Sequence, residues 1–143
     1  MTRNATLWLI QGLLAVVFLF AGGMKLVLPI SAMTGPVALP GFFLRFLGVA
    51  EVLGAAGLIL PGVFRIRSGL TPLAAAGLTI IMTGAMVITL MGGTVGPALV
   101  PLIVGLLATT VVYGRGGVAA VIASIIQFGK HEEARSRLRE RFQ

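Results

Sequence analysis

The sequence predicts an all-α fold: a transmembrane four-helix bundle followed by a C-terminal amphipathic and cationic tail helix. The first observation behind this prediction is composition. The 143 residues are 57% hydrophobic and only 10% charged, with a mean hydropathy of +1.06, whereas a soluble domain carries about 25% charged residues. The second is that four apolar stretches approach or reach the length of about 20 residues that a membrane-crossing helix needs. So few charges cannot cover a water-facing surface, which argues against a soluble enzyme.

Each apolar stretch ends at helix-breaking residues. These are Pro29, Pro61-Gly62, Gly92-Gly93 and the glycines of residues 114–117. The stretches are about twice as long as a barrel strand and lack its alternation, so they are expected to be helices. Within one domain, residues 1–115, the expected spans are residues 7–28, 42–60, 70–91 and 97–113.

Residues 116–143 form a separate segment. Val118, Val121, Ile122 and Ile125 recur at helical spacing, but this apolar run of about a dozen residues is too short to span. Residues 130–141 then hold five basic and three acidic side chains. We interpret the segment as an interfacial helix that leads into a basic cytoplasmic tail. No aromatic interleaving or fold motif accompanies the charge, so no nucleic-acid partner is expected.

The distribution of basic residues predicts the orientation in the membrane. With four spans, both termini and the middle loop lie on one side. That side carries four arginines before the tail is counted: Arg3, Arg65, Arg67 and Arg115. The opposite side has only Lys25 and Arg45, which is expected to reach toward the headgroups. The sequence therefore predicts a multi-pass protein of the inner (plasma) membrane with both termini inside.

Glu51 is the most informative polar residue, because it is the only acidic residue outside the tail. A carboxylate within a span is costly and by default marks a functional site. Its helical neighbours include Gly48, Gly54 and Ala55, and small residues are typical of a face that packs on another helix. We therefore expect Glu51 to point into the bundle. The alternative interpretation is a purely structural ion pair.

Lys25 is the expected partner of Glu51, since a lysine stem can reach several ångströms along its helix. Gln11 lies on the same face of the first span. Thr79, Thr83 and Met86 form a stripe on the third span, which predicts one wall of a mildly polar and adaptable cavity. Ordinary packing, with threonines bonded to their own helix, is the alternative for this stripe.

The residues for most other chemistries are missing. The chain has no Cys, and its single His131 begins a zincin-like pattern in which Arg135 stands in place of the second His. We therefore expect no metal site and no covalently held cofactor.

Several runs resemble the DoxX-like family of small four-helix integral membrane proteins. The run Ala21-Gly22-Gly23-Met24-Lys25-Leu26, preceded by Trp8, Gln11, Ala15 and Phe18, resembles the first helix of that family. Residues 48–61, which include Glu51, look like its second helix, and residues 70–78 look like its third. Many relatives carry a His toward the end of the third helix, where this chain has residues Thr89 to Met91.

The resemblance implies a four-helix inner-membrane protein, and some relatives are associated with quinone-linked oxidoreductase complexes. The first hypothesis is an accessory subunit that binds a quinone or lipid, with Glu51, Lys25, Gln11, Thr79, Thr83 and Met86 as candidate site residues. The second is a structural or assembly subunit without chemistry of its own. A stand-alone enzyme that uses Glu51 as acid or base is a third hypothesis. The expected partners are the lipid bilayer and either another membrane protein or a second copy of the chain.

The charge distribution makes the topology testable by labelling of single cysteines in the Cys-free chain. With both termini inside, Ser31→Cys is expected to react with an impermeant thiol reagent on intact cells, whereas Ser68→Cys is not. Both are expected to react once the membrane is permeabilised. The reverse pattern in intact cells would overturn the argument from charge.

Overall fold

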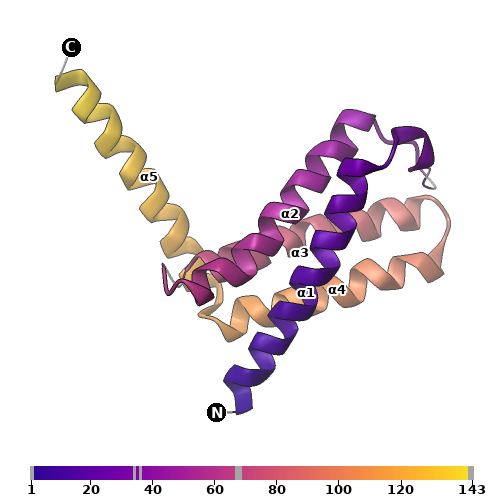
Figure 1. The fold of residues 1–143 in the computed structure, drawn as a ribbon, viewed down its shortest axis with the longest axis horizontal. Helices are drawn as coiled ribbons and strands as arrows, with labels where there is room; N and C mark the ends of the chain where they lie inside the picture. The colour runs from indigo at the N-terminus through magenta and orange to yellow at the C-terminus, as the bar shows by residue number, and fades with distance from the viewer. Residues whose placement is uncertain (1, 34, 36, 67–68, 142–143) are drawn as a thin grey trace.

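A computed structural model describes residues 2–33, 35, 37–66 and 69–141, and shows four long helices with a fifth that leaves the bundle (Figure 1). Arg67 and Ser68, which enter the topology argument, lie outside the described residues. The described residues contain no strand, which confirms the predicted all-α class. The helices are α1 (Thr2–Val27), α2 (Gly41–Val63), α3 (Leu70–Met91), α4 (Val95–Gly114) and α5 (Gly117–Arg141), with a single 3-10 turn, η1 (Ile30–Ala32), after α1.

Helices α1 to α4 are each long and apolar enough to cross a membrane, which confirms the four predicted spans. The fourth, α4, has 20 residues, which correspond to about 30 Å at 1.5 Å per residue, the thickness of the hydrocarbon layer. Large apolar side chains cover the outside of the bundle. Leu9 is 75% exposed, Phe42 80% and Ile80 73%, and a lipid environment removes the cost of such exposure.

Several helix ends differ from the predicted spans. α2 continues through Pro61 and Gly62 to Val63 instead of ending at residue 60, and Pro61 is buried within the last turn. α4 begins at Val95, before Pro97, and also includes Pro101. A proline in the first turn loses nothing, since its missing N–H would have no helical partner there. α1 begins at Thr2 because residues 2–6 contain no breaker.

The tail segment is one continuous helix, α5, in which the apolar run and the charged residues follow each other without a break. Gly116 (φ 139°) and Gly117 (φ 68°) turn the chain sharply at the end of α4, and this backbone conformation favours glycine. The first half of α5 packs on α3 and α4, where Ser124 is buried. From Ile125 to Arg141 every residue is exposed, and Figure 1 shows α5 projecting away from the four spans.

The bundle consists of two helix hairpins, α1–α2 and α3–α4, joined mainly through contacts between α2 and α3. α1 and α4 approach each other less closely. One core links all four helices, and its largest fully buried apolar side chains are Leu14, Phe18, Leu58 and Leu78. Small buried residues complete it: Ala15, Ala55, Ala75 and Ala108.

Gly22 sets how closely α1 and α2 approach. A Cβ at this position would lie 2.7 Å from the Gly48 carbonyl oxygen and 2.9 Å from Val52 Cγ2, whereas one at Gly23 would meet nothing within 4 Å. We therefore expect Gly22→Ala to force the helices apart and lower the free energy of unfolding in detergent by about 1–3 kcal/mol, as overpacking does. Gly23→Ala is the matched control. It is expected to be neutral or stabilising by up to about 1 kcal/mol, because alanine favours the helix. Equal thermal-unfolding midpoints for the two variants would contradict this account of the interface.

Candidate functional site

The structure brings Lys25 and Glu51 into direct contact. Lys25 Nζ lies 2.7 Å from both carboxylate oxygens of Glu51 and donates a hydrogen bond to each. The Glu51 side chain is 2% exposed and that of Lys25 is 28% exposed. The α1–α2 interface makes the contact possible, because a Cβ at Gly48 would lie 3.0 Å from both the Gly22 oxygen and Lys25 Cβ. A carboxylate in a span thus has its counter-ion on the neighbouring helix.

Arg45, which the sequence predicts to reach toward the headgroups, binds the end of α1 in the structure. Its Nη1 donates to the Lys25 carbonyl oxygen at 2.6 Å, and its Nη2 donates to the Leu28 carbonyl oxygen at 2.9 Å. The last carbonyls of a helix have no helical donor. Lys25 O is one of them because the residue four positions later is Pro29, which has no N–H. In hydrocarbon such a carbonyl needs a partner, and the Arg45 guanidinium supplies it.

Gln11 belongs to a second cluster, near the other end of α1. Its Nε2 donates to the Leu58 carbonyl oxygen at 3.2 Å, and its Oε1 accepts a bond of 2.8 Å from Arg115 Nη2. Arg115 Nη1 also donates to Asn4 Oδ1 at 3.2 Å, and the guanidinium lies 5.2 Å from the centre of the Trp8 ring. The cluster joins α1, α2 and the end of α4. Arg115 bonds two neutral side-chain amides of α1, and one of these, Gln11, also bonds the backbone of α2. From the sequence, Arg115 is evident only as a topology signal, and this role is not predicted.

The stripe on α3 lies apart from both clusters. Thr79 Oγ1 donates to the Ala75 carbonyl oxygen and Thr83 Oγ1 to the Thr79 carbonyl oxygen, both at 2.9 Å. Thr79 also lies 3.5 Å from Thr109 of α4, oxygen to oxygen. Thr83 is exposed, and Met86 is half-buried. The hydroxyls are thus bonded within their own helix, as the packing interpretation of this stripe requires. The six candidate residues do not form one site.

A groove of about 760 Å³ lies between α1 and α4, where the two helices approach less closely. None of the six candidate residues lines it. The lining residues run from the end of the bundle where α1 begins toward its middle: Arg3, Thr6, Leu7 and Ile10 from α1, and Gly114, Tyr113, Thr110, Thr109 and Leu106 from α4. The groove is therefore polar at one end and apolar toward the other. The sequence could not reveal it, because hydropathy does not tell which spans are neighbours.

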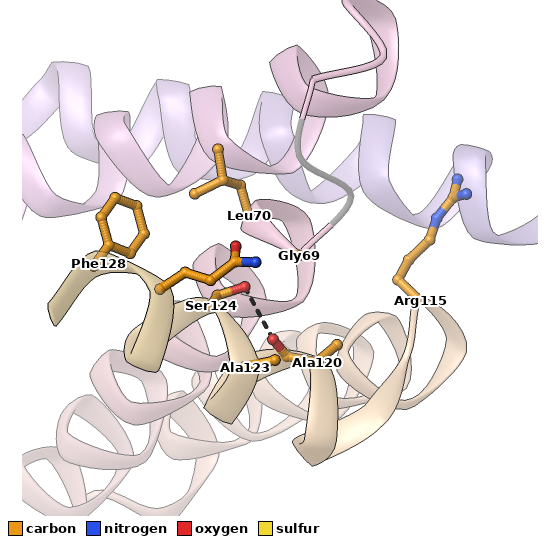
Figure 2. Close-up of a pocket in the computed structure, with 8 residues that line it drawn as sticks. Gly69, Leu70, Arg115, Ala120, Ala123, Ser124 and Phe128 are labelled. Atoms are coloured by element: carbon orange, nitrogen blue, oxygen red, sulfur yellow. Dashed lines mark hydrogen bonds between the residues drawn. The ribbon is translucent and has the colours of Figure 1, made fainter. Parts of the chain in front are cut away.

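A smaller cavity of about 390 Å³ lies where α5 meets the start of α3 and the end of α4. Figure 2 shows Gly69 and Leu70 on one side, Ala120, Ala123 and Ser124 of α5 on the other, and Arg115 at the edge. Ser124 Oγ donates to the Ala120 carbonyl oxygen at 2.9 Å, so its hydrogen is already used. The described residues contain no group of three His, Asp or Glu side chains that could hold a metal ion.

The contact between Lys25 and Glu51 can be tested by a double-mutant cycle in detergent. Glu51→Gln leaves an unpaired ammonium and Lys25→Met an unpaired carboxylate. Each is expected to lower the free energy of unfolding by about 2–3 kcal/mol, less than the roughly 3–5 kcal/mol of a fully buried pair because Lys25 is 28% exposed. The double variant is expected to recover most of the loss, since replacing both partners costs less than removing one. Additive losses would show that the two residues do not stabilise each other.

Comparison with known proteins places these features in a family. No curated protein and no solved structure matches the chain. The DoxX-like family matches residues 9–111, which include α2 and α3 in full and most of α1 and α4, and so confirms the resemblance seen in the sequence. Lys25, Arg45 and Glu51 lie within the matched region, whereas Arg3 and α5 lie outside it. The chain is therefore an integral membrane protein that belongs to the DoxX-like family.

Proposed function

We propose that the protein is an accessory subunit of a membrane oxidoreductase complex and that it binds a lipophilic ligand, a quinone or a lipid, in the groove between α1 and α4. The observation that carries the proposal is the groove itself. Its volume of about 760 Å³ lies within the roughly 300–1,000 Å³ range of small-molecule sites. Its position on the outside of the bundle allows a ligand to enter sideways from the bilayer.

The walls of the groove suit a molecule with one polar and one apolar end. Leu7, Ile10 and Leu106 offer apolar surface toward the middle of the bundle. Toward the end lies Tyr113, which is 64% exposed and has a phenolic hydroxyl that can donate to a carbonyl or ester oxygen. A quinone ring or a lipid glycerol region has such oxygens next to an apolar chain.

The ion pair supports a structural role for Glu51 instead of a role in binding the ligand. Lys25 bonds both carboxylate oxygens, and the side chain is almost fully buried. A ligand would have to break this pair before it could bind to the carboxylate. We therefore propose that Lys25, Glu51 and Arg45 hold α1 against α2, and that the ligand binds elsewhere.

The residue types present in the chain fit an accessory role better than a stand-alone enzyme. It has no Cys, a single His, and no Asp. Electron transfer to or from a quinone needs a redox cofactor, which in this proposal belongs to the partner. We propose that the protein and its partner lie in the inner membrane, with the termini of this chain inside. There α5 would lie along the anionic cytoplasmic surface with its basic residues toward the headgroups.

A structural or assembly subunit is the second candidate, and α5 favours it. From Ile125 to Arg141 every residue of the helix is exposed, and the helix presents both apolar and charged side chains. Such an exposed amphipathic helix suits a protein partner as well as a membrane surface.

The groove can be tested by extracting the protein purified in mild detergent and identifying co-purified lipophilic molecules by mass spectrometry. Leu106→Trp is expected to fill the groove and reduce the retained ligand at least fivefold, because the indole takes the place of the ligand. Ile103→Trp is the matched control. Ile103 is 57% exposed and Leu106 is 59% exposed, but only Leu106 lines the groove.

A wild-type protein that retains no defined lipophilic molecule would contradict the ligand-binding proposal. So would equal retention by the two tryptophan variants. A native pull-down separates the two candidate functions: a stable redox partner supports the first, and a set of partners without redox cofactors supports the second.

A further inference from the structure

The end of the bundle where α1 and α3 begin carries positive charge without internal compensation. We call it the cationic end, and Arg3, Arg65 and Arg115 lie there. In the described part of the chain no carboxylate pairs with any of these three guanidiniums. Glu51 is bonded to Lys25, and the remaining acidic residues lie on the outer part of α5. The carboxylates of the described residues therefore supply no counter-ion to the cationic end.

Arg3 differs from the other two arginines because it lines the α1–α4 groove. α1 and α4 run in opposite directions along the groove, so Arg3 of α1 lies at the same end as Tyr113 and Gly114 of α4. Leu7, Ile10 and Leu106 follow toward the middle. Arg3 and Ile10 are seven residues apart, about 10 Å along the helix axis. Within this length the groove combines a guanidinium, a phenol and apolar surface.

We propose that the groove binds an anionic phospholipid, with its phosphate against Arg3 and Tyr113 and its acyl chains along Leu7, Ile10 and Leu106. This inference rests on the proposed ligand groove and specifies its ligand class. A guanidinium forms strong, directed hydrogen bonds with phosphate oxygens, whereas a quinone has only neutral carbonyl oxygens to offer. Free phosphate would leave the apolar wall without an occupant. An acidic protein segment would have to place polar backbone against hydrocarbon.

The experiment measures binding of defined lipids to delipidated protein in detergent by native mass spectrometry. The lipids are dioleoyl phosphatidylglycerol and dioleoyl phosphatidylcholine, which share their acyl chains and differ in net charge. Wild type is expected to bind the phosphatidylglycerol more tightly. Arg3→Gln is expected to weaken that binding about fivefold, the effect of one basic residue near an anionic surface. It is expected to weaken phosphatidylcholine binding less, because the choline cation already neutralises the phosphate that the two lipids share. Arg65→Gln is the matched control, because it removes the same charge from the same end outside the groove.

The outcomes separate this inference from the proposal on which it rests. Leu106→Trp is expected to weaken the binding of both lipids. If it does so while Arg3→Gln has no effect, the groove stands and the preference for an anionic headgroup is overturned. Equal losses in Arg3→Gln and Arg65→Gln would also overturn the preference, since they would indicate diffuse attraction to the cationic end. If Leu106→Trp changes nothing, the groove itself is overturned. Displacement of phosphatidylglycerol by millimolar inorganic phosphate or by polyglutamate would assign the site to free phosphate or to an acidic protein.

Discussion

The cost of a charge in hydrocarbon is the constraint on which the arrangement of α1 and α2 depends. A single charged side chain in mid-membrane costs about 2.5–3.5 kcal/mol on insertion scales, and Glu51 is nearly fully buried. The Lys25 ammonium on the neighbouring helix offsets this cost only if the two backbones come close, and Gly22 and Gly48 allow that approach. The glycines and the ion pair therefore depend on each other. With larger residues at the glycine positions, the pair would be held apart and each charge would lie alone in the membrane.

The two ends of α1 are fixed by arginines from other helices. Arg45 of α2 bonds carbonyls at the end of α1, and Arg115, just after α4, bonds Asn4 and Gln11 near its beginning. Among the described residues, neither guanidinium pairs with a carboxylate. Arg45 uses backbone carbonyls at the end of a helix, and Arg115 uses side-chain amide oxygens, so the charges serve the hydrogen-bonding needs of backbone and amide groups. α1 is thereby positioned along its whole length, although it approaches α4 less closely than α2.

Much of this architecture could be predicted from the sequence, because a membrane fixes the length of a crossing helix and makes an unpaired charge costly. Span number followed from hydropathy and length, and the partnership of Lys25 with Glu51 followed from the reach of a lysine stem along its helix. α2 and α4 extend beyond their predicted ends. For α4 the reason is that Pro97 lies in the first turn, where a missing N–H costs little. The need for a donor to Lys25 O could have been predicted, because Pro29 lies four residues later and has no N–H. The groove and the Arg115 cluster could not be predicted, because both depend on which helices lie side by side and on how closely they approach.

The junction of two left-handed glycines between α4 and α5 has a consequence for the rotation of α5 about its own axis. Gly116 and Gly117 set the direction in which α5 leaves, and each residue of a helix advances the face by about 100°. One residue added or removed at this junction would rotate the exposed apolar stripe with Val118, Ile122 and Ile125 by about 100° relative to the bundle. The length of this short connection therefore determines which side chains of α5 face the bundle. A chain with the same α5 sequence, but with one residue more or fewer at the junction, would present a different set of side chains in each direction.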